Sequence, residues 1–376
     1  VPFHPGTTDI SDDRRIRASI PTIRYLQEQK CTIVLCSHLG RPEGRFVEEL
    51  RMGPVSKRLS ELTGVQVNQV PECIGSDVVN AVKQTKSGGI LMLENLRFHA
   101  GEEQNNEDFS SELASLAEVY VNDAFGVSHR KHSSIVGISR HLPSAAGFLM
   151  ARELDILFQI LDSPERPFSA ILGGAKLSDK LAVLENLKGK TDTVLIGGGM
   201  AANFLKAMDL NIGNSMVEEE KVPFAKSFAS TAQKSGITLK LPVDVVVAES
   251  FSTASRKRTV DISNIPQGWH IMDIGPNTAC IFEDALKPSR TVLWNGPMGV
   301  FEWKSFSYGT SRIAHTLANL DVASTIVGGG STAEVVSNLG LSKKMTHVST
   351  GGGASLELLE GKILPGIEVL KDKIQI

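Results

Sequence analysis

The stretch "VSTGGGASLELLEG", from Val348 to Gly361, passes from an apolar run through three glycines into an amphipathic helical pattern. Glycine loses more conformational freedom on folding than any other residue, so three at one junction require a structural reason. Three other turns have the same character: "LGGAK" at Leu172–Lys176, "IGGGMAA" at Ile196–Ala202 and "VGGGSTAE" at Val327–Glu334. Apolar strands that end in glycine turns before helices indicate an α/β fold.

Short apolar runs alternate with longer helical patterns along the whole chain, which predicts parallel sheets covered by helices. With 376 residues the chain exceeds the usual size of one core, so we expect two domains. We predict first-domain strands at 32–38, 89–96 and 119–125, and second-domain strands at 169–175, 193–199, 243–249, 291–297, 324–330 and 346–353. The predicted fold is therefore α/β, with two doubly wound, Rossmann-like parallel-sheet domains.

The domain boundaries follow from a helical pattern between the two sets of strands. We predict an N-terminal domain over 1–150, a connecting helix over 151–168 and a C-terminal domain over 169–361. Pro164 and Pro167 are expected to end the helix. The tail 362–376 has no strand partner nearby in the sequence, so the pattern does not decide which domain it packs against.

The composition is that of an ordinary globular protein, with 41% hydrophobic and 22% charged residues. The net charge of −3 argues against nucleic-acid and membrane partners, so an anion site must come from local clustering. The four cysteines form no C-x-x-C pair and no zinc spacing with histidine, which favours reduced structural thiols. We find no signal peptide and no apolar run of membrane-spanning length, and expect a soluble, cytoplasmic protein.

The glycine turns of the second domain predict a polyphosphate site. Ligands of open α/β sheets bind beyond the carboxyl ends of the strands, where glycine turns point backbone N–H groups at the ligand and the following helix adds partial positive charge. Lys176 and Lys180 are expected on one face of the helix after the first turn, as phosphate ligands. Alternatively, each turn is only a tight connection and both lysines are solvated.

Basic side chains follow the strands of the first domain. "SHLGRP" contains His38 and Arg41, "ENLRFH" contains Arg97, and "HRKH" contains His129, Arg130 and His132. The planar guanidinium group matches carboxylate and phosphate oxygens, so this set predicts a site for a small, multiply charged acid. By contrast, we expect Arg14 and Arg17 to be surface ion pairs, because Asp12 and Asp13 precede them.

The sequence suggests no Ser-His-Asp or Cys-His arrangement and no metal spacing for the histidines. The mechanism left by these exclusions is catalysis by substrate positioning and charge neutralisation, and this is the mechanism that phosphoryl transfer requires. We therefore predict a two-domain kinase for a small acid, in which domain closure brings the substrates together and excludes water.

Two alternatives stay open. The pattern G-x-G-x-x-A at Gly197–Ala202 and Gly328–Ala333 is also typical of NAD-dependent dehydrogenases. That reading requires an acidic residue closing a second strand about 20 residues later. After the first match the acids are Glu218–Glu220, without a strand before them. The third class is a catalytically dead nucleotide-binding scaffold.

Seven motifs in the same order resemble phosphoglycerate kinase: "SHLGRP", "ENLRF", "HRKHSS", "GGAKLSDK", "GGGMA", "WNGPMGVFE" and "STGGGASLELLEG". The resemblance extends from about Ile10 to the end. It implies a glycolytic phosphotransferase with a carboxyl group as acceptor, which transfers a phosphoryl group between 1,3-bisphosphoglycerate and ADP to give 3-phosphoglycerate and MgATP. It also implies a connecting helix, a tail that returns to the first domain, and Mg²⁺ bound with the nucleotide. We expect a monomer.

The resemblance further implies roles for single residues. Arg15 is expected at the transferring group, together with Lys176 and the amides of Gly351 and Gly352. The phosphoglycerate-binding residues implied are Arg15, His38, Arg41, Arg97 and Arg130. The nucleotide-binding residues implied are Gly174, Lys176, Lys180, Gly198, Gly199, Asn295, Glu302, Gly330, Ser331 and Thr332.

The sequence departs from the family pattern at two places. Family members have a strand ending in "RVDFN", whose Asp and Asn bind phosphoglycerate, and the printed sequence begins just after that point, at "VPFHPG". We expect the first domain as written to lack this strand and its two ligands. The family commonly reads "GGGD" where this chain reads "GGGST", so the expected Mg²⁺ position is Ser331. We predict that Mg²⁺ dependence is kept, with weaker metal affinity in the absence of nucleotide.

Overall fold

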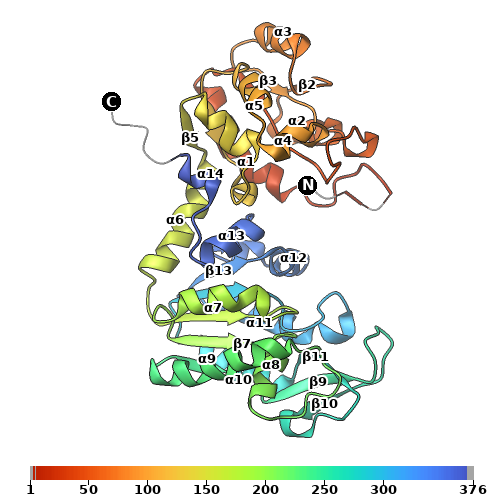
Figure 1. Cartoon of the computed structure of the whole chain (residues 1–376), viewed down its shortest axis with the longest axis vertical. Helices are drawn as coiled ribbons and strands as arrows, with labels where there is room; N and C mark the ends of the chain where they lie inside the picture. Colours follow the sequence, from red (N-terminus) through yellow and green to blue (C-terminus); the bar gives the residue numbers. More distant parts are fainter. Residues whose placement is uncertain (1–2, 5, 371–376) are drawn as a thin grey trace. The chain divides into compact units, whose positions relative to one another are not determined.

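The computed structural model describes residues 3–4 and 6–370, and the chain forms two units (Figure 1). Unit 1 comprises Val1–Leu154 and Ile363–Ile376, and unit 2 comprises Asp155–Lys362. The boundary lies inside helix α6, Phe148–Asp162. Each unit is described here by itself.

Unit 2 contains a six-stranded parallel sheet in the order β14-β13-β12-β6-β7-β8. The two central strands, β12 and β6, are buried along their whole length, as their continuous apolar sequences predict. The strands are β6 (Phe168–Leu172), β7 (Thr193–Ile196), β8 (Thr238–Lys240), β12 (Thr291–Asn295), β13 (Ser324–Gly328) and β14 (His347–Val348).

The strand order shows that the sheet is doubly wound. The chain moves outward from β6 to β7 and β8 in one direction, and from β12 to β13 and β14 in the other. Right-handed crossovers therefore place the connecting helices of the two halves on opposite faces. The switch point lies between β6 and β12, which is where ligands of such sheets bind.

The helices of unit 2 pack accordingly: α8 packs on α9 and α7 on α13, whereas α11 packs on α10 and α12 (Figure 1). They are α7 (Leu181–Leu187), α8 (Ala201–Ala207), α9 (Val222–Lys234), α10 (Pro276–Leu286), α11 (Tyr308–Ala318), α12 (Gly330–Asn338) and α13 (Gly353–Leu359). The core between sheet and helices includes Trp294, Phe282 and Ile313, all fully buried.

One predicted strand belongs to a different sheet. The run 243–249 does form a strand, β9 (Asp244–Ala248), but its expected place in the parallel sheet was wrong. It is the centre of a small antiparallel sheet, between β10 (Lys257–Asp261) and β11 (His270–Ile274). Only the loop 249–256 joins β9 to β10, and a parallel pair would need a crossover of a dozen or more residues.

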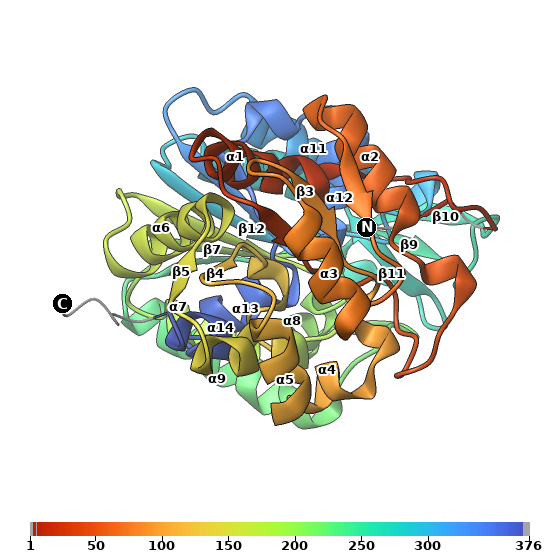
Figure 2. The same ribbon diagram turned by 90° about the horizontal axis from the view of Figure 1, so that it is seen from above.

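Unit 1 contains two parallel sheets. One has the order β1-β3-β2, with β1 at Ile33–Leu35, β2 at Val67–Gln69 and β3 at Ile90–Met92. The other pairs β4 (Tyr120–Asn122) with β5 (Ser144–Ala146). Helix α1 packs on α2 (Figure 2). The helices of unit 1 up to α6 are α1 (Arg14–Glu28), α2 (Gly53–Thr63), α3 (Ser76–Gln84), α4 (Ala100–Gln104) and α5 (Glu107–Ala114).

The connecting helix is shorter than predicted. Helix α6 begins at Phe148 and ends at Asp162, so the predicted range 151–168 was wrong at both ends. Its end precedes Pro164, because the residue before a proline is disfavoured in helical conformation. In the tail, α14 (Pro365–Glu368) contacts the N-terminal segment of unit 1, because the Gly366 N–H donates to the Ser128 carbonyl at 2.8 Å.

The cysteines are unpaired: Cys73 is buried, Cys36 half-buried, and Cys31 and Cys280 exposed. This agrees with the expectation of free thiols. Across the described residues, every helix is too short or too polar to reach from one side of a membrane to the other.

Candidate active site

The glycine turns after β6, β7 and β12 interlock at the switch point of unit 2. A Cβ atom on Gly198 would lie 2.7 Å from the Gly174 nitrogen, and one on Gly296 would lie 2.3 Å from the Gly173 oxygen. Both glycines also have positive φ, +65° and +97°. The backbone N–H groups of Gly173, Gly174 and Gly198 donate to the carbonyls of Asn295, Pro297 and Met298, each at 3.0 Å.

These hydrogen bonds correct one expectation. We expected the N–H groups of all four glycine turns to point at a ligand, but those of Gly174 and Gly198 are used by neighbouring turns. Gly199 is also enclosed, because a Cβ atom there would lie 2.7 Å from the Ala175 oxygen. Packing between the turns therefore requires glycine at Gly198 and Gly199, whereas Gly174 has open space around it and needs glycine for its φ of +110°.

The turns before α12 and α13 are different. For the N–H groups of Gly330, Ser331, Gly352 and Gly353 no acceptor is found within the described ranges. Gly352 has φ +51°, and a Cβ atom there would meet nothing within 4 Å. The Gly351 N–H, in contrast, donates to the Ser349 hydroxyl at 3.1 Å. Free backbone donors at open helix N-termini are suited to an anion.

Lys180 and Asn295 form a buried polar pair at the end of β12. Lys180 is 8% exposed and Asn295 2% exposed, and the Lys180 ammonium donates to Asn295 Oδ1 at 2.5 Å. Burial lowers the pKa of Lys180. Asn295 Nδ2 is buried without a hydrogen-bond partner. Two donors therefore converge beside the switch point and lack an anionic acceptor.

The two lysines do not share a helix face, so that prediction was wrong. Lys176 lies in an exposed loop, and Lys180 ends a 3₁₀ turn, Ser178–Lys180, before α7 begins at Leu181. The reason is local: the chain needs the extra residues after the interlocked Gly173–Gly174 turn before it can enter the helix.

Three other predicted nucleotide residues occupy different environments. Ser331 and Glu302 are exposed, whereas Thr332 is fully buried. The Thr332 hydroxyl accepts a hydrogen bond from the Gly296 N–H at 2.8 Å. Thr332 thus connects the first turn of α12 to the turn after β12.

The predicted basic residues of unit 1 gather around His38. Burial and the nearby Arg97 charge lower the pKa of His38 to about 3, and Arg130 contributes in the same direction. Arg97 is 4% exposed, and burial lowers its pKa, with Arg130 and Arg41 adding to this effect. Arg97 Nη1 donates to the Gly40 carbonyl at 2.9 Å, and Arg97 Nε forms an ion pair with Glu103 Oε1 at 3.3 Å. Four cationic or basic groups thus share one site.

Ion pairing separates two groups of arginines. Arg14 and Arg17 pair with Asp12 and Asp13 at 2.6 and 2.8 Å, which confirms the expectation for them. Within the described part of the chain, the guanidinium groups of Arg15, Arg41 and Arg130 have no carboxylate partner within 4 Å. Arg15 is exposed in the first turn of α1, and its place beside the other basic residues stays a prediction.

Sequence reasoning included His132 in the basic set without giving it a role of its own, and it missed Glu102. His132 is 8% exposed, its charge lowers the pKa of His38, and its Nδ1 lies 3.7 Å from Glu102 Oε1. The buried Glu102 also accepts hydrogen bonds from the Ser134 N–H and hydroxyl, at 3.0 and 2.6 Å. The "HRKH" motif signalled His132, but nothing marked Glu102 among the glutamates around it.

A family model described as phosphoglycerate kinase matches residues 1–362. The chain belongs to the phosphoglycerate kinase family. The phosphoglycerate kinase of Microcystis aeruginosa is 50% identical over 375 residues, covering 99% of this chain and 93% of that protein. The phosphoglycerate kinase of Pelotomaculum thermopropionicum is 50% identical over 373 residues, covering 99% and 94%.

Solved structures agree with these matches. The phosphoglycerate kinase of Coxiella burnetii is 38% identical with a TM-score of 0.85, over 98% of this chain and 93% of that one. That of Pyrococcus horikoshii is 32% identical, with the same TM-score and coverage. The predicted fold class and family are confirmed, and as a phosphoglycerate kinase family member the chain is an enzyme, a kinase of glycolysis.

The comparisons give no support to the dehydrogenase or scaffold alternatives. The geometry also argues against a dinucleotide site. The strand that follows the first G-x-G-x-x-A match is β8, and its last residue is Lys240. A dinucleotide site would have an acidic residue at the end of that strand, to bind the ribose hydroxyl.

Proposed function

We propose that unit 2 binds ADP or ATP at its switch point, with Lys180 and Asn295 as phosphate ligands. The observation that carries this proposal is the Lys180 ammonium, a buried cation whose hydrogen-bond partner within the described residues is a neutral amide. A buried charge without a counter-ion is unfavourable, and a phosphate would supply it. Lys176 and Ser331, exposed at the same strand ends, would contact the outer phosphates.

The remaining nucleotide residues would act through the backbone or at the sugar. The free N–H groups of Gly330 and Ser331, at the positive end of α12, would hold phosphate oxygens. Gly174, Gly198 and Gly199 would shape the wall of the site: the neighbours of Gly198 and Gly199 leave no room for a side chain, and Gly174 has a φ of +110°, which favours glycine. Glu302, exposed after β12, would bind the ribose hydroxyls.

Unit 1 would bind 3-phosphoglycerate or 1,3-bisphosphoglycerate through its basic set. Arg97 provides a buried, oriented guanidinium, and Arg41 and Arg130 provide charges that have no carboxylate partner among the described residues. His38 is neutral near pH 7 in the ligand-free protein, so it would act first as a hydrogen-bonding group. An arriving anion would offset the charge repulsion that now lowers its pKa.

Catalysis would consist of positioning and charge neutralisation, since the attacking carboxylate of 3-phosphoglycerate is already a nucleophile. Arg15 and Lys176 would neutralise charge on the transferring phosphoryl group. The free N–H groups at Gly352 and Gly353 would donate to its oxygens, where fixed donors are most effective. Closure of the two units around the substrates stays a prediction of the sequence.

Mg²⁺ would be held as a complex with the nucleotide. The first turn of α12 has no acidic residue, and Ser331 offers a neutral hydroxyl there. This donor set does not suit a free ion but fits a cation that brings phosphate ligands with it. When bound, Mg²⁺ would neutralise phosphate charge, with Ser331 as its ligand from the chain.

We also propose that the protein works as a monomer in the cytoplasm. Free thiols support a reducing compartment, and the substrates are small molecules.

The direct test is turnover. The purified chain would be mixed with MgATP and 3-phosphoglycerate, and ADP formation followed in a coupled assay with a trap for the acyl phosphate. We expect turnover on the order of 1–100 per second. Absence of turnover with intact MgADP binding would reject the proposed reaction while keeping the nucleotide site.

Lys180→Met tests the observation that carries the proposal. Charge-assisted hydrogen bonds contribute about 1.5–3 kcal/mol, so MgADP affinity should fall about 10- to 100-fold, with a larger fall in turnover. The unfolding temperature should not fall, because a desolvated charge is removed. The control is Lys226→Met, an exposed lysine on α9. Equal MgADP affinity in both variants would overturn the assignment of Lys180.

A further inference from the structure

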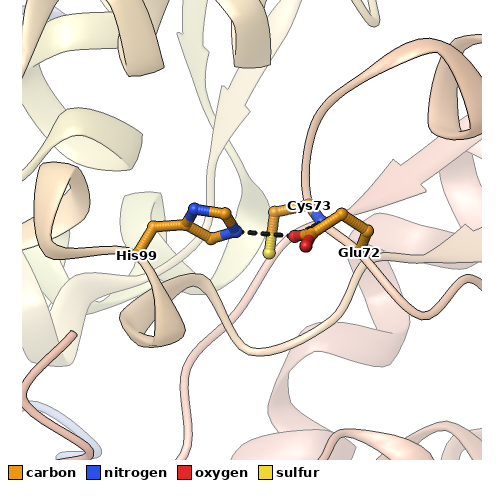
Figure 3. A group of neighbouring side chains, drawn as sticks. All are labelled: Glu72, Cys73 and His99. Carbon is orange, nitrogen blue, oxygen red and sulfur yellow. Dashed lines mark hydrogen bonds and ion pairs between the residues drawn. The ribbon is translucent and has the colours of Figure 1, made fainter. Parts of the chain in front are cut away.

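Three potential metal ligands from separate parts of the sequence meet in unit 1 (Figure 3). Glu72 and Cys73 lie in the loop between β2 and α3, and His99 lies between the 3₁₀ turn Leu96–Phe98 and α4. One carboxylate oxygen, the Cys73 sulfur and one imidazole nitrogen all lie within 4.8 Å of one another. None of the three belongs to the sites described above.

We propose that Glu72, Cys73 and His99 form a binding site for a soft divalent cation, with Zn²⁺ as the best match. Thiolate, imidazole and carboxylate together are ligands of Zn²⁺, whereas Mg²⁺ prefers oxygen ligands alone. Three such ligands leave the fourth tetrahedral position to water. Binding would release the Cys73 thiol proton to solvent, and the sulfur–metal bond would replace the S–H donation.

The geometry is close to what the cation needs. Zn–S, Zn–N and Zn–O bonds of about 2.0–2.3 Å place tetrahedral ligand atoms roughly 3.3–3.6 Å apart. Here His99 Nε2 lies 2.6 Å from Glu72 Oε1, and no ligand pair exceeds 4.8 Å. Small side-chain rotations would give the required spacing. They would move His99 Nε2 and Glu72 Oε1 apart and bring both atoms closer to the Cys73 sulfur.

The surroundings hold the ligands and leave an entry. The Cys73 thiol donates to the Glu94 carbonyl at 3.1 Å, and the Cys73 N–H donates to Glu72 Oε1 at 2.7 Å. The His99 ring stacks on Phe109, with centroids 5.1 Å apart. The Glu72 and His99 side chains are 51% and 28% exposed, whereas Cys73 is fully buried. The sulfur therefore forms the floor of a site that opens to solvent through the other two ligands.

The test uses the full chain, freed of metal and kept reduced without a chelator. Zn²⁺ titration by calorimetry should show one saturable site, and Co²⁺ in its place should give a sulfur-to-cobalt charge-transfer band in the near ultraviolet. His99→Gln and Cys73→Ser should each weaken Zn²⁺ binding by about 100-fold or more, since even outer-shell partners contribute 10- to 100-fold. Cys73→Ser should also abolish the band.

Matched controls separate this site from adventitious binding. His141→Gln removes an ordinary histidine–glutamate pair, in which His141 Nε2 lies 3.0 Å from Glu107 Oε1 without a cysteine. Cys31→Ser removes an exposed thiol. Both controls should bind Zn²⁺ like the parent chain. If Cys73→Ser fails to fold, the proposal is tested by the Zn²⁺ affinity of His99→Gln and by the sulfur-to-cobalt band of the parent chain. No saturable site, or equal loss in the controls, overturns the proposal; kinase activity is not the readout.

Discussion

The two units present cations to anionic ligands in opposite ways. In unit 1 the charges are on side chains, and Arg15, Arg41 and Arg130 have no acidic partner among the described residues. In unit 2 the donors are a single buried ammonium, Lys180, and backbone N–H groups at the starts of α12 and α13. Charges on side chains can change position by rotation about side-chain bonds, whereas backbone donors are fixed by the fold. Removing one group from each unit should therefore have different consequences.

The largest effect is expected from Arg97→Gln in unit 1. Truncating one member of a buried, hydrogen-bonded charge site costs about 2–5 kcal/mol, so the affinity for 3-phosphoglycerate should fall about 30- to 5,000-fold. MgADP affinity should stay unchanged. Arg17→Gln is the control, because Arg17 is exposed and paired with Asp13. Calorimetric titrations of each variant with 3-phosphoglycerate and with MgADP would measure these affinities. Equal 3-phosphoglycerate affinity in Arg97→Gln and Arg17→Gln would show that Arg97 does not belong to the site.

Gly352→Ala tests the backbone donors of unit 2. Since its Cβ atom would meet nothing within 4 Å, the stability cost should come from the backbone conformation, φ +51° and ψ −109°, which alanine rarely adopts, and should be about 1–3 kcal/mol. Turnover should fall about 100-fold, as for a lost oxyanion donor, with MgADP affinity changed far less. Gly340→Ala is the control, because Gly340 also has a positive φ, +70°, and open space for a Cβ atom, but it follows the C-terminal end of α12. Equal losses in turnover and MgADP affinity would contradict the role of Gly352.

Buried titratable groups give the two units opposite pH dependence. In unit 2, burial raises the pKa of Asp273 to about 7, so the folded state binds a proton that the unfolded state releases near pH 4. Stability should therefore fall as pH rises from about 4 to 7, by about 2 kcal/mol between pH 5 and 8. In unit 1, the lowered pKa of His38 makes stability rise between about pH 3 and 6.5.

Denaturant unfolding at several pH values, followed in Asp273→Asn and His38→Gln, would separate the two contributions. Asp273→Asn should flatten the loss toward neutral pH, and His38→Gln should flatten the gain from acid pH. An unchanged profile in Asp273→Asn would mean that its carboxyl, which accepts from the Gly309 and Ile274 N–H groups, stays ionised in the fold.

The smallest effect is expected from Ser331→Asp. A carboxylate at the first turn of α12 should strengthen Mg²⁺ binding without nucleotide about 10-fold, because Mg²⁺ prefers charged oxygen ligands. The Mg²⁺ concentration needed for half-maximal turnover should fall as well, and Ser331→Ala serves as the control. If the Mg²⁺ requirement of Ser331→Asp were unchanged, Ser331 would not be a metal position.

Local sequence patterns were sufficient for five of the six strands of the doubly wound sheet, because continuous apolar runs ending in glycine are short-range signals. The sixth strand, β8, was missed, because it is short, lies at the edge of the sheet and is not followed by a glycine turn. Local patterns were also sufficient for the family, since "WNGPMGVFE" and "STGGGASLELLEG" are long motifs. They were not sufficient for β9, because an apolar run does not reveal whether its partners are parallel or antiparallel. Nor did they separate Lys176, which is exposed, from the buried Lys180.

Cysteine spacing shows the same limit. The sequence has no zinc spacing, yet Glu72, Cys73 and His99 meet because two loops at the ends of neighbouring strands β2 and β3 come together. The sequence by itself determined which residues can carry charge, where the strands that end in glycine turns form, and which family the chain belongs to. Only the tertiary structure decided which glycine N–H groups are already bonded and which cations are left without partners. Those properties depend on contacts between segments far apart in the chain, and no local pattern records them.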